Sequence, residues 1–383
     1  MRLELVRRTQ PSRRMALLSP LIAVALTVVT AFFLFMLYGV DPFRGVYIYF
    51  VEPLEGLYSL YVHVRHWTLS AQVISNDMWQ ATELVVKATP LVLIGAGLAV
   101  TYLSNNWNIG AEGQFIIGAV AGSGIPVLLP EFQNFATLPL MLLLGALGGA
   151  AYAMVPALLK TRFSTNEILT SLMLVYAASL FLDWMVRGPW RDPRAFGFPN
   201  TVTFPDAAMI PFFGTGRLNA SAIIAIVIVL ALAFVFGRTL KGFEIRVLGE
   251  SPRAGAFAGF SAKRMTIFAF AVSGALAGLA GIMEVASVIG KLQPVISPGY
   301  GFTAIIVAFL GRLNPIGILI AGFVVALSYL GGEAIQTMLQ LPSKVAQVLQ
   351  GALLFYVLAC DSLILYRIRA VRTNAPRGAA ADA

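Results

Sequence analysis

The sequence predicts an all-α, polytopic membrane protein with about ten transmembrane helices. Two bulk observations predict this class: 58% of the 383 residues are hydrophobic, and only 12% are charged, whereas soluble domains have about 25%. The third observation is that apolar runs recur, each near the length of about 20 residues that a membrane span requires. The net charge of +9 is then expected to gather in cytoplasmic segments. We expect no nucleic-acid partner.

The chain opens with a basic cytoplasmic segment, 1–14, followed by an apolar run from Met15 to Tyr38. That run exceeds the roughly 7–15 residues of a signal-peptide core, so we expect an uncleaved first span. The further predicted spans cover 83–103, 112–129, 138–159, 164–186, 219–237, 265–288, a short segment at 302–310, 316–330 and 345–365. The basic N-terminus is expected in the cytoplasm, and an even number of spans then places the C-terminus there as well. We expect a single transmembrane domain at 15–366 and a cytoplasmic tail at 367–383.

The connections have distinct compositions. Outer loops are expected at 39–80 and at 187–218, and the second of these is rich in proline and therefore poor in continuous helix. The most charged interior segment, 238–264, is expected in the cytoplasm. Small-residue faces at 145–151 and 274–281 favour close helix packing.

Two segments are expected to be broken or re-entrant. Residues 105–114 place three Asn, a Glu, a Gln and two Gly between two apolar runs, which is costly in hydrocarbon unless every polar group is satisfied. Residues 294–312 combine chain-breaking Pro and Gly with an apolar run too short for an ordinary span. A helix that starts near Ala111 would direct free N–H groups at a ligand. The alternative is a cytoplasmic turn in which Glu112 stabilises the first helical turn.

Other polar residues in or beside the spans are candidates for function, because an ionisable group inside a membrane bundle is costly. Glu284 lies late in the span 265–288, where it is alternatively an interface residue or a partner of Lys291. Ser164 and Glu167 have the spacing of a capping box. Glu333 and Gln336 are expected to follow the span 316–330.

Several chemistries are not indicated. No G-x-x-x-x-G-K-[ST] phosphate loop is present, so the chain does not itself hold ATP in this way. No nucleophile elbow, HExxH or kinase motif appears. One Cys, Cys360, and two His leave no Cys-based or His-rich metal site. Within the cytoplasmic segment, Ser251 and Pro252 have the pattern of a helix cap and first helical residue, which predicts a short helix at 249–259. This helix is either a docking surface for a soluble partner or a basic turn on lipid head groups.

Four stretches resemble a known family. Asn108–Gln114 is similar to the N-[IL]-G-x-E-G-Q stretch of permease subunits of bacterial ABC importers, in the nucleoside or simple-sugar branch of the sugar, ribose and branched-chain amino acid type. Asn166–Tyr176 resembles N-E-[VI]-[IL]-x-[TS]-x-M-L-N-Y in that branch. Gly242–Ala254 resembles G-x-x-x-R-A-x-G-x-N-P-x-A, and Gly301–Pro315 resembles G-[FY]-x-x-I-x-V-A-[LF]-L-G-x-x-x-P. Val175 and Ser251 depart from these patterns, where the branch has Asn.

The resemblance implies a non-enzymatic permease subunit of the bacterial inner membrane that passes a nucleoside by alternating access and binds no cofactor or metal itself. ATP and Mg would be held by a separate cytoplasmic ATPase. A second homologous permease subunit, a periplasmic or lipid-anchored solute-binding protein and membrane lipids are the other expected partners. The expected ATPase-coupling residues are Gly249, Glu250, Ser251, Pro252, Arg253 and Ala254. The expected substrate path comprises Asn106, Asn108, Glu112, Gln114, Asn166, Glu167 and Glu284.

Three alternatives remain open on the residues alone. A simple-sugar importer would share every motif above. An ion-coupled secondary transporter would work without an ATPase, and a membrane-embedded enzyme would act on lipid. The segment 249–259 separates the importer from the secondary transporter, because only the importer requires a docking surface for an ATPase.

Overall fold

The computed structural model describes residues 2–7, 13–65, 79–213 and 217–371. The chain divides into two compact units, one formed by 1–46 with 347–383 and the other by 47–346. In the described part, eight helices are long and apolar enough to cross a membrane, and 300–310 and 344–360 form shorter apolar helices. The predicted helical membrane bundle with about ten spanning or broken elements is therefore confirmed.

The first unit joins the two ends of the chain. It contains β1 (Arg2–Arg7), α1 (Arg13–Leu37), α2 (Pro42–Val46), most of α15 (Lys344–Leu365) and β2 (Tyr366–Val371). β1 pairs with β2 in antiparallel register, with Arg2 opposite Val371. The side chains of Thr30 and Tyr356 share a hydrogen bond of 2.7 Å, which ties α1 to α15. The two ends of the chain therefore lie on the same side of this unit.

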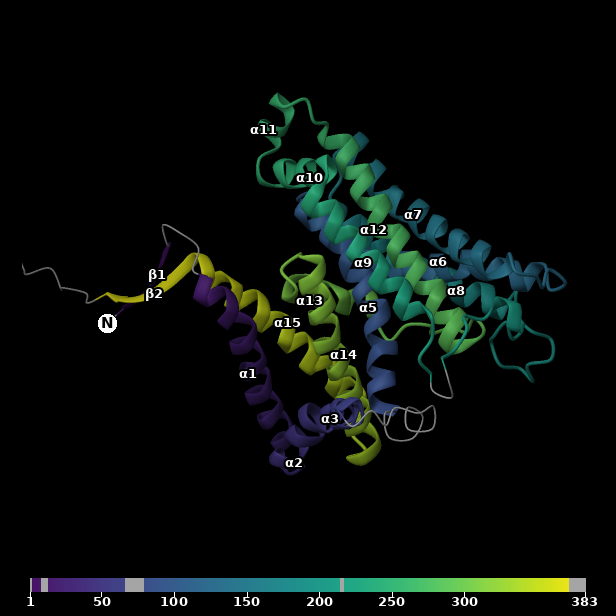
Figure 1. Cartoon of the computed structure of the whole chain (residues 1–383), viewed down its shortest axis with the longest axis horizontal. Helices are drawn as coiled ribbons and strands as arrows, with labels where there is room; N and C mark the ends of the chain where they lie inside the picture. The colour runs from purple at the N-terminus through teal and green to yellow at the C-terminus, as the bar shows by residue number, and fades with distance from the viewer. Residues whose placement is uncertain (1, 8–12, 66–78, 214–216, 372–383) are drawn as a thin grey trace, which may run out of the picture. The chain divides into compact units, whose positions relative to one another are not determined.

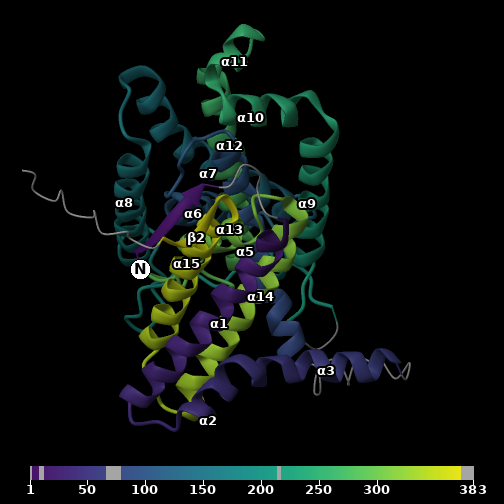
Figure 2. The same ribbon diagram turned by 90° about the vertical axis from the view of Figure 1, so that its left-hand side faces the viewer.

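The second unit holds the helices between these ends (Figure 1). Its helical elements in order are η1 (Tyr47–Val51), α3 (Glu52–Arg65), α5 (Trp79–Leu103), α6 (Ala111–Leu128), α7 (Thr137–Phe163), α8 (Glu167–Arg187), η2 (Asp206–Ala208), α9 (Ser221–Arg238), α10 (Leu240–Glu250), α11 (Pro252–Phe257), α12 (Ala262–Glu284), η3 (Val285–Ile289), α13 (Tyr300–Leu310) and α14 (Pro315–Met338). Both views place α10 and α11 at one end of this unit and α3 at the opposite end (Figure 2). We call these the coupling end and the far end.

The core of the second unit is built on glycine. α5 is buried along almost its whole length, and α12 packs against α5, α6 and α7. An alanine methyl at Gly118 of α6 would overlap the backbone of Gly278 on α12. One at Gly149 of α7 would overlap the backbone of Gly274. Small residues let the helix backbones approach closely, and the resulting van der Waals contacts hold helices together in lipid, where the hydrophobic effect does not.

Two boundaries differ from the predictions. α14 continues to Met338, so the prediction that Glu333 and Gln336 follow this span is wrong, and both lie in its last turns. Polar residues at the end of a span are compatible with helix, and the chain turns only at Gln340, which has a φ of 53°. α7 likewise extends past the predicted 159 to Phe163.

The predicted capping box at the start of α8 is also wrong. Ser164 has a φ of 54° and ends α7 instead. Asn166 caps α8, because its side chain accepts from the backbone N–H groups of Ile168 and Leu169. At the start of α11 the prediction is confirmed: Ser251 caps the helix and Pro252 is its first residue.

The glycine packing generates a testable difference between two matched substitutions. Gly278→Ala adds a methyl against the backbones of Gly145 and Gly149, whereas Gly237→Ala adds one where no atom lies within 4 Å. We expect Gly278→Ala to destabilise the protein by about 1–3 kcal/mol through overpacking. Thermal unfolding of the purified protein in detergent measures this as a lower midpoint. An equal effect of Gly237→Ala would show that the cost is not one of packing.

Candidate functional site

The polar stretch 105–114 is a true break between two helices. α5 ends at Leu103, Asn105 adopts a φ of 55°, and α6 begins only at Ala111. A methyl at Gly110 would lie 2.9 Å from the carbonyl oxygen of Ser171, the fifth residue of α8. Four helical rises bring that residue about 6 Å beyond the start of α8. The chain therefore turns at the coupling end and re-enters the bundle before α6 begins, as predicted for a re-entrant segment.

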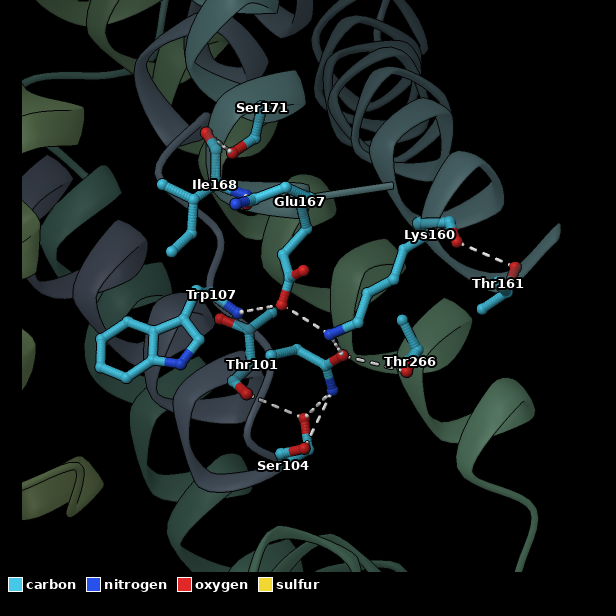
Figure 3. A network of polar contacts seen from close by, with 12 residues as sticks. Thr101, Ser104, Trp107, Lys160, Thr161, Glu167, Ile168, Ser171 and Thr266 are labelled. Carbon is cyan, nitrogen blue, oxygen red and sulfur yellow. Dashed lines mark hydrogen bonds and ion pairs between the residues drawn. The ribbon is translucent and has the colours of Figure 1, made fainter. Parts of the chain in front are cut away.

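Asn106 is the centre of a buried polar network at this turn (Figure 3). Its Oδ1 accepts from Lys160 Nζ and from Thr266 Oγ1, each at 3.0 Å, and its amide donates to the backbone and side chain of Ser104. Lys160 Nζ also lies 2.5 Å from Glu167 Oε1, which accepts weakly from the Trp107 N–H. The network joins the ends of α5 and α7 to the starts of α8 and α12.

A second amide pair lies deeper. Asn108 is fully buried and exchanges hydrogen bonds with the side chain of Gln114, at 2.9 and 3.0 Å. Asn108 also donates to Ser273 of α12 at 3.1 Å and accepts from the Gly110 N–H at 3.0 Å. The Tyr102 hydroxyl donates to the Asn108 carbonyl. The side chain of Asn108 thus replaces the backbone partners that an unbroken helix would supply.

Glu112 connects the two broken segments. It lies in the first turn of α6, is 6% exposed, and accepts from the backbone N–H of Gly301 at 2.6 Å. Gly301 is the second residue of α13, so the carboxylate stabilises two helix N-termini at once. A side chain at position 301 would overlap the Glu112 backbone. The start of α13 therefore lies inside the bundle, beside the start of α6.

α13 runs from this junction to an aromatic cluster. Phe309, near its end, stacks on Tyr102 of α5 with ring centroids 5.2 Å apart and lies 6.1 Å from the Trp107 ring. Asn314 then caps α14, with Pro315 as its first residue. α13 and the aromatic cluster therefore occupy the part of the bundle between Glu112 and the coupling end.

The predicted coupling segment is in direct contact with the re-entrant stretch. A methyl at Gly249, in the last turn of α10, would overlap the carbonyl of Leu103, where α5 ends. On α11, Gly255 packs against Leu248, while the Phe257 side chain is 95% exposed. α11 thus presents an apolar side chain outward and is connected through α10 to the start of the 104–110 segment.

The remaining predicted path residue lies elsewhere. Glu284 ends α12 and is 9% exposed, and among ion pairs of the described residues none includes Glu284 or Lys291. The structure therefore brings Asn106 and Glu167 together in one network, through Lys160. It brings Asn108 and Gln114 together in a second, and Glu112 lies beside Gln114 at the start of α6. Asn166 acts at this turn as a helix cap, and Glu284 is not part of these networks.

A concave surface lies at the far end of the second unit. A cavity of about 560 Å³ is bordered by α3, the start of α5 and the end of α14. Its walls combine one aromatic ring, that of Trp79, with the amides of Gln80 and Gln336 and the carboxylates of Glu52 and Glu333. This is the size and mixture of groups found in small-molecule sites.

Sequence reasoning missed several participants. Lys160 lies between the predicted spans 138–159 and 164–186, Ser273 lies within the predicted span 265–288, and Gly301 lies in the predicted broken segment 294–312, so none of them was a candidate. One signal in the sequence could have found Lys160. Lys160 and Glu167 lie on either side of a short turn between two predicted antiparallel helices, which brings their opposite charges close together.

The family described as branched-chain amino acid transport system / permease component matches residues 80–358, which contain both broken segments and the coupling helix. The chain belongs to this family. It is a transport subunit of the ABC-permease type and a multi-pass membrane protein, so the resemblance stated from its motifs is confirmed.

Curated relatives of the permease have named solutes. It is 32% identical to a glucose ABC transporter permease of Haloferax volcanii, over 79% of this chain and 82% of that protein. It is 29% identical to a nucleoside ABC transporter permease of Lactococcus lactis subsp. cremoris, over 70% and 76%. A guanosine ABC transporter permease of Bacillus subtilis is 26% identical, over 74% and 82%.

The buried amide pair predicts a large structural effect. Asn108→Ala leaves the Gln114 side chain and the Gly110 N–H without their partner, and each unsatisfied buried group costs about 1–3 kcal/mol. We expect a clear fall in the thermal midpoint of the purified permease. Gln133→Ala, which removes an exposed amide bonded only to the Pro130 carbonyl, is the control and should have little effect. A midpoint unchanged in Asn108→Ala contradicts the structural role.

Proposed function

We propose that this permease is the membrane subunit of an ATP-driven importer that passes a nucleoside across the inner membrane by alternating access. The observation that carries the proposal is the junction at Glu112, where two helix N-termini meet inside the bundle. Broken helices with inward-facing N-termini are typical of transporter binding sites. A simple sugar is the second candidate, because the glucose permease of Haloferax volcanii is 32% identical.

The partners proposed are those that an importer of this kind requires. A cytoplasmic ATPase supplies ATP hydrolysis with its own Mg, a second homologous permease completes the membrane part, and a solute-binding protein delivers the nucleoside or sugar. The cavity beside Trp79 lies at the end of the second unit opposite α11, which supports solute entry there. Both chain termini are proposed to lie in the cytoplasm. α11 is the proposed ATPase dock, through Gly249 to Ala254.

The proposed mechanism links the dock to the path through short, rigid contacts. Motion of α11 reaches α10, and the close approach of Gly249 to Leu103 transmits it to the end of α5. The Asn106 network then decides how α5, α7, α8 and α12 sit at that end. An ATPase shifts this equilibrium only if it binds the two arrangements with different affinity. Asn106, Asn108, Glu112, Gln114, Asn166 and Glu167 are proposed to line or close the inner part of the path.

Substitution of Glu112 tests the path. Glu112→Gln keeps the size of the side chain and an oxygen that accepts from Gly301, but removes the charge at the two helix N-termini. We expect uptake of radiolabelled nucleoside by cells to fall at least tenfold, which corresponds to about 1.4 kcal/mol in the rate-limiting step.

The matched control for this variant is Glu131→Gln, an exposed carboxylate in the loop after α6. Surface abundance and co-purification of partners should stay unchanged in both variants. Normal uptake by Glu112→Gln would remove Glu112 from the path.

Deletion of 250–256 tests the dock. We expect the ATPase to be lost from pull-downs while the permease still inserts in the membrane, because the deletion removes α11 up to Ala256. Arg253→Ala should weaken association in the same assay. Lys263→Ala changes an exposed cation just outside the segment and serves as control. An ATPase that still associates with the deletion variant would show that it does not dock at 250–256.

A separate variant distinguishes docking from transmission. Gly249→Ala leaves α11 intact but forces α10 away from the Leu103 carbonyl. We expect this variant to bind the ATPase normally and to lose most of its uptake. Loss of both together would show that position 249 acts only through docking.

A further inference from the structure

Half of the eight residues that line a small cavity at the far end of α12 have a side-chain oxygen. It lies where α5, α9 and α12 meet, distant along α12 from the Asn106 and Asn108 networks. Its walls are Val86, Thr89, Pro90, Ser221, Ala280, Met283, Glu284 and Ser287. Thr89, Ser221, Glu284 and Ser287 are all less than one tenth exposed.

The three hydroxyl groups offer only acceptors to this cavity. Thr89 donates its proton to the Val85 carbonyl at 2.8 Å, and Ser287 donates to the Met283 carbonyl at 2.6 Å. Ser221 donates to the side-chain oxygen of Asn219. Because a hydroxyl has one proton and two lone pairs, each oxygen keeps acceptor capacity but has no second proton to donate.

Two backbone irregularities surround the same space. Pro90 lies inside α5 and has no N–H, so the carbonyl of Val86, four residues earlier, lacks its helical donor. On α12, the regular helix ends at Glu284 and the π-helical turn η3 carries Ser287. Turns of this kind occur frequently at functional sites. Val86, whose carbonyl lacks a helical donor, is one of the residues that line the cavity.

The charges nearby leave Glu284 uncompensated. Lys87, Arg217 and Glu83 are the charged groups that act on it through space. Arg217 pairs with Glu83 at 3.1 Å, and Lys87 pairs with Glu333 at 2.6 Å. Each nearby cation is therefore engaged with another carboxylate, and none of the ion pairs among the described residues includes Glu284. An isolated buried carboxylate of this kind is strongly disfavoured unless it takes up a proton or a cation accompanies it.

We propose that this cavity binds one monovalent cation of the size of sodium, with the Glu284 carboxylate and the oxygens of Thr89, Ser221 and Ser287 as its ligands. Hard cations take oxygen ligands, and a single free carboxylate balances a single positive charge. The space holds about 10 Å³ for the centre of a water-sized sphere, close to the lower limit for one water molecule. The cation would join α5, α9 and α12, independently of ATPase docking.

The test measures sodium binding to the full-length permease in lipid nanodiscs. We expect sodium chloride to raise the thermal midpoint above that in choline chloride at equal ionic strength, because a ligand that binds only the folded state stabilises it. Bound radioactive sodium should saturate at one ion per chain. Glu284→Gln should abolish both effects, and Asp183→Asn, which alters an exposed carboxylate paired with Arg187, should leave both unchanged.

Two further variants keep the carboxylate in case Glu284→Gln fails to fold. Thr89→Val and Ser287→Ala each remove one oxygen, and each should raise the half-saturating sodium concentration at least about tenfold, as loss of metal-site groups does. Absence of saturable sodium binding to the native protein would overturn the proposal. So would sodium affinity unchanged in Thr89→Val and Ser287→Ala. Stabilisation by acid alone, without sodium, would identify a protonated carboxyl and also overturn it.

Discussion

The close approach of α12 to α6 and α7 is the constraint on which the rest of the second unit depends. Gly118, Gly149, Gly274 and Gly278 let three backbones meet with no side chain between them. Because α6 is fixed against α12 in this way, its first turn is carried to the level where Ser273 can accept from Asn108. At that position the polar groups of the re-entrant segment find their hydrogen-bond partners. The packing of the helices and the hydrogen bonding of this segment therefore depend on each other.

Two kinds of contact hold the helices of the second unit together, rigid glycine contacts within the bundle and a polar side-chain network at the coupling end. The glycine contacts have little freedom, because any shift of the backbones opens a gap or creates an overlap. The network around Asn106 consists of long side chains such as Lys160 and Glu167, which are only partly buried and can exchange partners. A bundle built in this way is expected to move as rigid helices that reorganise at their polar ends. α10 and α11 are placed where such reorganisation is greatest.

The sequence identified the class, most spans and both breaks, because apolar length and the cost of polar groups in hydrocarbon are local properties. The depth of the breaks was not predictable. It depends on which distant residues satisfy them, such as Gly301 for Glu112 and Lys160 for Asn106. The cap at Asn166 was missed in favour of Ser164, because residue types permit both and only the left-handed turn at Ser164 decides. Glu284 was recognised as costly, but its surroundings come from three helices that are remote in sequence.

The pairing of β1 with β2 has a consequence for biosynthesis. About 360 residues separate β1 from its partner, and all of them must be synthesised before this ribbon can close. α1 meets its neighbour α15 equally late, whereas the second unit can complete its contacts earlier. Nascent chains therefore spend most of their synthesis with the first helix in the lipid and its final neighbour not yet made. Quality control in the membrane would act during that interval. In a chain that stops short of β2, the ribbon could never close.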